Sequence, residues 1–302
     1  MGLRRRLLGT LLIGLAVAMT LTAPAAASAR RVVLPDGRRL FLECRGKGTP
    51  TVVLEAGFRN RADVWSTLAA PGQTVTVFGA LARDTRVCAY DRPGTVSADL
   101  SARSRSDPVR MPRATGALVA DLRSLLRAAR LRPPYVLVGH STGGLVVRQY
   151  TSTRPRRVAG LVLVDAIPET MATSLPTSSW NAYNANYLTA PPPPLADYAD
   201  LEYIDFRESF AQMRRVGVRP PRRIPFIVLS KGQPFGIPGR LGGQVDAAWA
   251  RGGRYLASLQ PGTPRIVARD SGHYIMLEDP KLVIDSVRRV IRAVRAGRSS
   301  LR

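Results

Sequence analysis

The sequence predicts an α/β fold in which helices cover both faces of a mostly parallel sheet. Short apolar stretches typical of buried strands recur along the chain, and segments with helical spacing alternate with the later ones. One strand also runs directly into a glycine-rich turn and a helix. Parallel strands need crossover connections, which place helices on the faces of the sheet. The length of 302 residues suits a single large core.

The amino-terminal part of the predicted sheet begins with a hairpin. Residues 31–34 and 39–44 are strand-like and flank the turn sequence Pro35-Asp36-Gly37. A third strand covers residues 51–54, and a fourth covers residues 85–90 before a turn at residues 91–94.

The carboxy-terminal part alternates between helix and strand. Apolar residues recur at helical spacing before a strand that begins at Tyr135; they are Leu118, Leu122, Leu125, Leu126 and Ala129. Further strands are predicted at residues 158–164, 225–229 and 265–268. A closing helix covers residues 280–296, and Gly297 is its stop signal.

Residues 168–223, between the sixth and seventh predicted strands, differ in composition from the rest. They carry four consecutive prolines at 191–194 and many aromatic residues, namely Trp180, Tyr183, Tyr187, Tyr198, Tyr203, Phe206 and Phe210. A helix is predicted with Leu201, Ile204, Phe210 and Met213 along one side. Because long insertions in compact domains are usually functional, we predict a lid that lines an apolar pocket. The alternative is an insertion whose aromatic residues pack only into a small core of their own.

Residues 1–29 have the pattern of a secretory signal peptide. Three arginines at positions 4–6 precede an apolar run at residues 7–21, and small residues at 25–29 offer a cleavage site near Ala29. The apolar run is shorter than the roughly 20 residues that a membrane-spanning helix needs. We therefore predict a secreted protein whose mature domain covers residues 30–302.

The chain is strongly basic, with a formal net charge of +24. Only Lys47, Lys231 and Lys281 are lysines, and the arginines are scattered along the sequence. A nucleic-acid site is expected to gather its basic residues into a patch, so no specific nucleic-acid partner is predicted. Electrostatic association with an acidic cell envelope is expected, and it should weaken as salt is raised.

Residues 139–143 read Gly-His-Ser-Thr-Gly between the Tyr135 strand and a helix-like segment. This is the G-x-S-x-G nucleophile elbow in its expected context, where a sharp turn requires neighbours without bulk on both sides of the serine. The helix that follows directs backbone N–H groups and a positive dipole end at an anion formed beside the serine. Ser141 is therefore the predicted nucleophile.

A serine nucleophile needs a base, which is most often histidine. The chain has two histidines. His140 is adjacent to Ser141 in sequence, and its side chain should point away from the serine oxygen. His273 follows the last predicted strand, where a loop at the carboxyl edge of the sheet can bring it over Ser141, so His273 is the predicted base.

These motifs resemble the α/β-hydrolase family, in particular its secreted bacterial members. The resemblance rests on residues 54–58 (Leu-Glu-Ala-Gly-Phe), 90–94 (Tyr-Asp-Arg-Pro-Gly), 139–144 and 271–273 (Ser-Gly-His), which occur in family order. It implies an eight-stranded, mostly parallel sheet in which the second strand runs antiparallel beside the fourth. It also implies a triad in the order Ser, acid, His, and a structural turn at Asp91 and Arg92 without catalytic chemistry.

The fold implied by the resemblance places Cys44 and Cys88 on antiparallel neighbours. They are the only cysteines, and an even number in an exported protein permits a disulfide. We predict a Cys44–Cys88 bond.

The triad acid departs from the usual family pattern. Most members carry it after the seventh strand, but residues 230–234 here contain no carboxylate. Some relatives carry it one strand earlier, and Asp165 lies at the end of the sixth strand, where it can hold the tautomer of His273. Asp246 is the alternative acid. The resemblance assigns the oxyanion hole to the backbone N–H groups of Phe58 and Thr142.

The sequence contains no metal-ligand cluster and no phosphate or dinucleotide loop, so neither a metal nor a cofactor is expected. We predict a secreted serine hydrolase that cleaves a small carboxylic ester through an acyl-enzyme, with an apolar or aromatic substrate. Serine at the elbow disfavours the epoxide hydrolase and dehalogenase branches, which use aspartate. The alternatives are a proline-specific peptidase, an amidase or a thioesterase with the same triad, or a non-catalytic basic relative that binds the envelope.

Overall fold

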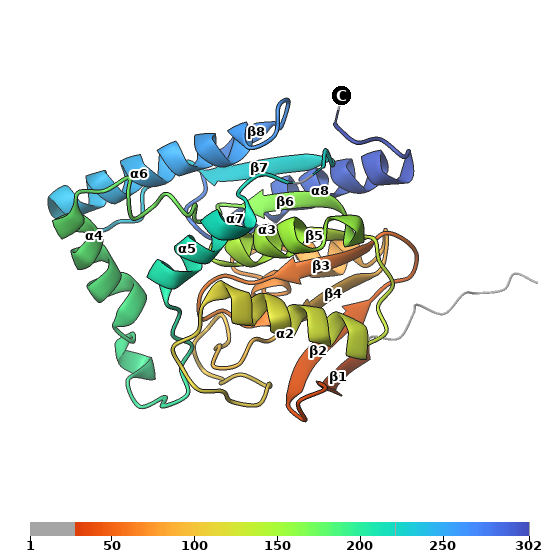
Figure 1. The fold of residues 1–302 in the computed structure, drawn as a ribbon, viewed down its shortest axis with the longest axis horizontal. Coiled ribbons are helices and arrows are strands. Elements are labelled where there is room, and N and C mark those ends of the chain that lie inside the picture. The colour runs from red at the N-terminus through yellow and green to blue at the C-terminus, as the bar shows by residue number, and fades with distance from the viewer. Residues whose placement is uncertain (1–27, 221, 302) are drawn as a thin grey trace, which may run out of the picture.

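The computed structural model describes residues 28–220 and 222–301, which form an eight-stranded sheet with the strand order β1-β2-β4-β3-β5-β6-β7-β8 (Figure 1). Strand β2 runs antiparallel to β1 and β4, and the other neighbours are parallel, as predicted. The strands are β1 (Ser28–Val33), β2 (Arg39–Arg45), β3 (Thr51–Glu55), β4 (Val87–Tyr90), β5 (Tyr135–His140), β6 (Val158–Val164), β7 (Phe226–Lys231) and β8 (Arg265–Ala268).

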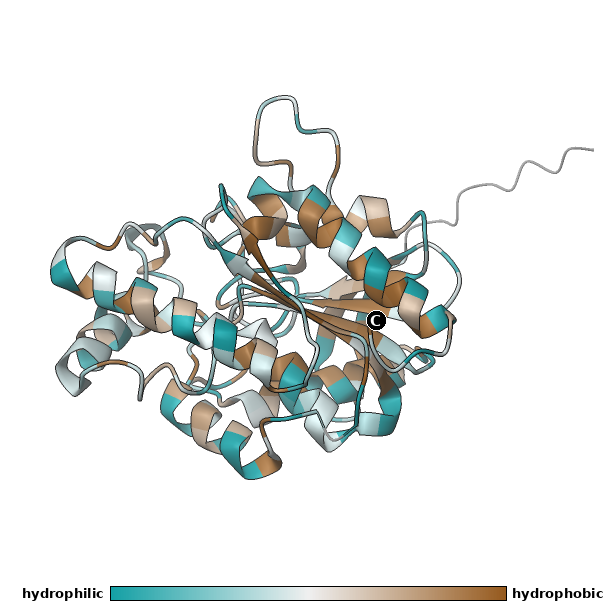
Figure 2. Cartoon of the chain, turned by 90° about the horizontal axis from the view of Figure 1, so that it is seen from above, coloured by the Kyte–Doolittle hydropathy of each residue, from teal (hydrophilic) through white to brown (hydrophobic). Residues whose placement is uncertain are grey.

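Helices cover both faces of the sheet, so the predicted α/β class is confirmed (Figure 2). One face packs against α2 (Thr115–Ala128), α3 (Gly143–Thr153) and α6 (Gly239–Ser258), and α5 (Phe206–Val216) packs onto α2 and α3. The other face packs against α1 (Val77–Leu81), α7 (Ile275–Glu278) and α8 (Pro280–Arg295). Short 3-10 turns complete the fold at η1 (Ala62–Trp65), η2 (Pro155–Arg157) and η4 (Pro193–Leu195).

Strand β5 shows why the central strands are apolar throughout. All six of its residues are buried. Tyr135 and Leu137 belong to the core on the α2 and α3 side, whereas Val136 and Val138 belong to the core on the α8 side. A strand covered on both faces favours apolar residues on both of its sides, and residues 135–138 fit this central position in the sheet.

The insertion between β6 and β7 contains α4 (Thr177–Tyr183), the π-helical segment η3 (Asn184–Thr189), η4 and α5. The predicted amphipathic helix was partly wrong. Phe210 and Met213 are buried on α5, but Leu201 and Ile204 precede the helix. The reason is that the Asp205 side chain caps α5 by accepting the N–H of Glu208 at 2.9 Å.

The predicted disulfide between Cys44 and Cys88 is present. The two residues lie opposite each other on the antiparallel strands β2 and β4. The predicted signal peptide covers residues 1–29, of which 1–27 lie outside the described residues. Within the described ranges, no helix has both the length and the apolar character needed to cross a membrane.

We expect the double variant Cys44→Ser/Cys88→Ser to lose about 2 to 4 kcal/mol of unfolding free energy, because the bond restricts the unfolded chain. The cysteines are separated by 44 residues, so the restricted loop is long. Urea unfolding followed by circular dichroism measures the loss. Wild-type protein in reductant is the control and should match the variant, and equal midpoints with and without reductant would contradict the prediction.

Candidate active site

Ser141 occupies a strained turn between β5 and α3. Its φ of 50° lies in the left-handed region, which is uncommon for a residue with a side chain. Backbone hydrogen bonds hold this conformation. The N–H of Ser141 donates to Val164 at 3.1 Å, and its carbonyl accepts the N–H groups of Ile167 at 3.1 Å and Gly144 at 3.0 Å.

The two motif glycines are required because backbone atoms approach them closely. A Cβ at Gly139 would lie 2.6 Å from the carbonyl oxygen of Gly143. A Cβ at Gly143 would lie 2.5 Å from the carbonyl oxygens of Ala56 and Glu55. Larger residues at either position would push the elbow away from β3 and displace Ser141.

Asp165 immediately follows β6 and also has a left-handed backbone, with φ of 41°. Its N–H donates to Leu229 at 2.9 Å. The Oδ1 atom accepts the N–H of Lys231 at 2.9 Å, and the Oδ2 atom lies 2.7 Å from Nδ1 of His273. Asp165 is 2% exposed, so its carboxylate is held by these partners away from solvent.

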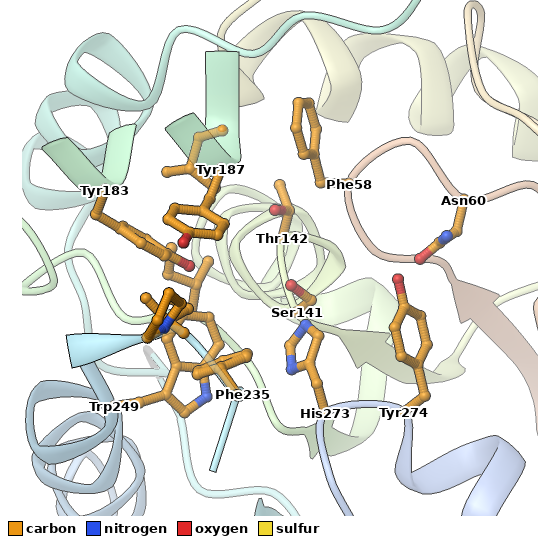
Figure 3. Close-up of a pocket in the computed structure, with 15 residues that line it drawn as sticks. Phe58, Asn60, Ser141, Thr142, Tyr183, Tyr187, Phe235, Trp249, His273 and Tyr274 are labelled. Atoms are coloured by element: carbon orange, nitrogen blue, oxygen red, sulfur yellow. The ribbon is translucent and has the colours of Figure 1, made fainter. Parts of the chain in front are cut away.

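His273 follows β8 and lies next to Ser141, with a ring nitrogen directed at the serine (Figure 3). Because the carboxylate of Asp165 can only accept, the ring proton is assigned to Nδ1, which leaves Nε2 with a free lone pair. The structure therefore brings Ser141, His273 and Asp165 together as the sequence predicts.

The alternative acid, Asp246, is engaged elsewhere. It lies on α6, where its Oδ1 accepts Nζ of Lys231 at 2.6 Å and the N–H of Phe235 at 3.1 Å. Lys231 also lies over the ring of Phe235, 4.1 Å from its centre. These contacts give Asp246 a role in shaping the loop after β7, and the geometry favours Asp165 as the partner of His273.

The backbone N–H groups of Phe58 and Thr142 fit the predicted oxyanion hole. Both residues line the cavity beside Ser141 (Figure 3). Neither N–H donates to a group in the part of the chain that the structure describes. These two N–H groups beside the serine oxygen have no protein acceptor among the described residues, so both can donate to a developing negative charge.

Arg92 holds the strand end that carries Phe58. This guanidinium is 2% exposed and donates to the carbonyl of Ala56 at 2.8 Å and that of Gly57 at 2.6 Å. The carbonyl of Gly57 and the N–H of Phe58 belong to one peptide group and point in opposite directions across a trans peptide. Anchoring the carbonyl therefore sets the direction of the N–H.

Two buried carboxylates pair with Arg92. Its guanidinium pairs with Glu55 at 2.7 Å and with Glu202 of the insertion at 2.6 Å. Burial acts to lower the pKa of Arg92, but Glu202 and Glu55 raise it above its usual value. Glu202 also accepts the N–H of Arg59 at 2.6 Å. The turn at Asp91 and Arg92 is structural, as expected.

The sequence did not reveal the roles of His140 and Glu202. His140 is fully buried, and its Nε2 donates to the carbonyl of His273 at 3.0 Å. Burial, and then the charge of His273, lowers the pKa of His140 well below its usual range. Neutral His140 thus holds the loop that carries His273 through this hydrogen bond. Only its position next to Ser141 hinted at such a role, and Glu202 gave no signal at all.

Ser141 and His273 open into a cavity of about 340 Å³ with largely apolar walls. The insertion, the loop after β7 and helix α6 supply most of the wall (Figure 3). The aromatic and aliphatic lining residues are Phe58, Ile167, Tyr183, Tyr187, Leu188, Phe235, Ile237, Pro238, Trp249 and Tyr274. The described residues contain no cluster of side chains suited to a metal ion.

A family model described as the alpha/beta hydrolase family matches residues 52–286. The chain belongs to this family. It is 24% identical over 244 residues to the uncharacterized protein YqjL of Bacillus subtilis, across 79% of this chain and 82% of that protein.

Solved structures agree on the fold. A putative lipase from Acinetobacter baumannii superposes with a TM-score of 0.60 and 18% identity, over 90% of this chain and 93% of that one. The esterase RhEst1 from Rhodococcus superposes with a TM-score of 0.56 and 22% identity, over 88% and 99%. Membership of the α/β-hydrolase family confirms the predicted resemblance and supports a hydrolytic enzyme.

We expect His140 to make the protein less stable in mild acid. Its folded pKa is depressed, so below about pH 6.5 the unfolded chain binds a proton that the folded chain does not. Stability should fall as pH drops below that value, by at most about 1.4 kcal/mol per pH unit from this group. Urea unfolding between pH 7.5 and 5.5 measures the slope. The variant His140→Gln keeps a donor for the His273 carbonyl and should have a shallower slope; identical slopes would rule out this role for His140.

Proposed function

We propose that this protein is a secreted serine hydrolase that cleaves a carboxylic ester through an acyl-enzyme. This proposal rests on the 2.7 Å contact between Nδ1 of His273 and Oδ2 of Asp165, beside a cavity that Ser141 also lines. This contact orients the imidazole and leaves Nε2 free to act as a base toward the serine hydroxyl.

In the first half-reaction, Ser141 Oγ attacks the ester carbonyl while Nε2 of His273 takes the hydroxyl proton. The new bond from Oγ to the acyl carbon moves the carbonyl electron pair onto oxygen, where the N–H groups of Phe58 and Thr142 stabilise it. The tetrahedral intermediate then expels the alcohol, which receives the proton from His273. Asp165 stays ionised and stabilises the imidazolium throughout.

In the second half-reaction, His273 removes a proton from water as the water oxygen attacks the acyl carbon. The carboxylic acid leaves, and the proton returns to Ser141. The same two backbone donors bind the second oxyanion, so one preorganised site serves both steps.

The cavity wall supports an apolar or aromatic substrate. We propose that residues 168–223 act as a lid, since Tyr183, Tyr187 and Leu188 of this insertion line the space in front of Ser141. Their side chains offer dispersion contacts and no fixed charge, which suits an acyl chain or an aromatic alcohol better than a sugar. The fold itself does not choose among esters, amides and thioesters.

We also propose that the protein is exported after cleavage of residues 1–29. The disulfide supports this, because disulfides persist mainly in oxidising compartments outside the cytosol. The basic surface is then available to an acidic cell envelope.

A fluorophosphonate probe should label the wild-type protein, and Ser141→Ala should abolish labelling and ester hydrolysis together.

Asp165→Asn should lower kcat by about 10⁴, because the orientation and charge that support His273 are lost. Asp246→Asn is the matched control and should keep kcat within about threefold, since Asp246 contacts neither Ser141 nor His273. Absence of labelling in the wild type would favour a non-catalytic binding protein, and a large loss in Asp246→Asn alone would move the acid to that residue.

Hydrolysis of nitrophenyl esters should improve with acyl length until the cavity is filled. Tyr187→Ala should raise KM for the longest good substrate by about fivefold and leave kcat nearly unchanged, because it removes apolar contact and no catalytic group. Tyr198→Ala is the control within the same insertion, since Tyr198 does not line this cavity. Equal effects of the two variants would assign the insertion a purely structural role, and faster turnover of matched amides, thioesters or peptides would change the substrate class.

A further inference from the structure

A second pocket lies at the amino ends of the parallel strands, whereas Ser141 lies at their carboxyl ends. It is a hollow of about 150 Å³ between α2, the end of α3, η2 and the start of β5. Tyr135 is the first residue of β5 and lines this hollow, whereas His140 is the last residue of the same strand. Six residue steps along a strand separate the hollow from Ser141 by about 20 Å.

Four arginines converge on this hollow: Arg123, Arg127, Arg154 and Arg157. None of them takes part in an ion pair with a described carboxylate, although many other arginines of the chain do. Arg123 and Arg127 lie one turn apart on α2, where like charges repel each other. Arg123 is half-buried and the other three are exposed, so four guanidinium groups without a carboxylate partner surround one open hollow, which favours an anion there.

Tyr150 provides an independent sign that the hollow binds a ligand. Its side chain is 1% exposed and lines the hollow. Its hydroxyl has no hydrogen-bond partner among residues 28–220 and 222–301, whereas the neighbouring Tyr135 donates to Leu131 at 2.8 Å. Burial raises the pKa of Tyr150, and Arg157, Arg154 and Arg123, which line the same hollow, act against that rise. The hydroxyl is not among the fully buried unpaired side-chain atoms, so it reaches the hollow, where it can donate to an acceptor.

We propose that these four arginines and Tyr150 form a binding site for a phosphate group. Planar guanidinium groups donate pairs of hydrogen bonds to phosphate oxygens, and a phosphate offers enough oxygens to bind several arginines at once. A carboxylate has only two oxygens and would leave most of these donors unused. The Tyr150 hydroxyl donates to a further phosphate oxygen. The phosphate group belongs either to a small soluble phosphate or to a phospholipid headgroup.

The site can be tested with two probes on the full chain. Isothermal titration calorimetry with pyrophosphate, at constant ionic strength in chloride, measures binding of a free phosphate. Co-sedimentation with phosphatidylglycerol vesicles, against phosphatidylcholine vesicles, measures binding of a headgroup. We expect the wild type to bind at least one probe, and acetate at the same ionic strength should not compete.

The double variant Arg123→Gln/Arg157→Gln should weaken that binding at least tenfold, and Tyr150→Phe should weaken it several-fold. The control Arg110→Gln/Arg207→Gln removes the same charge from two exposed arginines outside the hollow and should change binding less than twofold. Circular dichroism and Tm confirm that each variant is folded. Binding of pyrophosphate alone assigns a soluble ligand, and binding of vesicles alone assigns a headgroup. Failure of the wild type to bind either probe, or equal weakening in the control, would overturn the site, and neither result bears on Ser141.

Discussion

The parallel register of β5 and β6 is the constraint on which the site depends. Gly139 pairs with Leu163 and His140 with Val164, so the next residues of the two strands, Ser141 and Asp165, leave the same edge of the sheet side by side. Both adopt a left-handed backbone, and both continue the hydrogen-bond ladder to the neighbouring strand through their own N–H groups. The hydrogen bonds to the rigid sheet thus offset the backbone strain of the two turns. They also fix the directions of the serine and carboxylate side chains.

The buried charges around Arg92 connect this edge to the insertion. Glu55 ends β3, Arg92 follows β4, and Glu202 belongs to the insertion, so three distant segments meet at one guanidinium. Removing Arg92 would leave two carboxylates in the core without this cation, which is far more costly than losing a surface ion pair. Arg59 extends the connection by donating to the carbonyls of Thr189 and Ala190 in the insertion. The direction of the Phe58 N–H and the placement of the pocket wall are therefore set by the same network.

Much of the fold and of the candidate site could be predicted from the sequence, because local sequence patterns encode them. The apolar strand before Ser141 and the glycines around it specify the elbow, and His273 was the remaining candidate base. Asp165 required knowledge of where relatives place the acid. The start of α5 was misplaced because the cap at Asp205 outweighs the apolar spacing of Leu201 and Ile204. His140 and Glu202 act through partners 133 and 110 residues away in the chain, and no local pattern encodes such contacts.

The two ends of strand β5 lie in different electrostatic surroundings. In the proposed mechanism His273 gains and loses a proton beside Asp165, and a nearby group of cations would oppose protonation of the imidazole. The arginine hollow lies about 20 Å away along β5, and Arg127, Arg154 and Arg157 are exposed, so distance and solvent weaken the effect of their charges on His273. The length of one central strand thus separates the arginine hollow from the proposed histidine base.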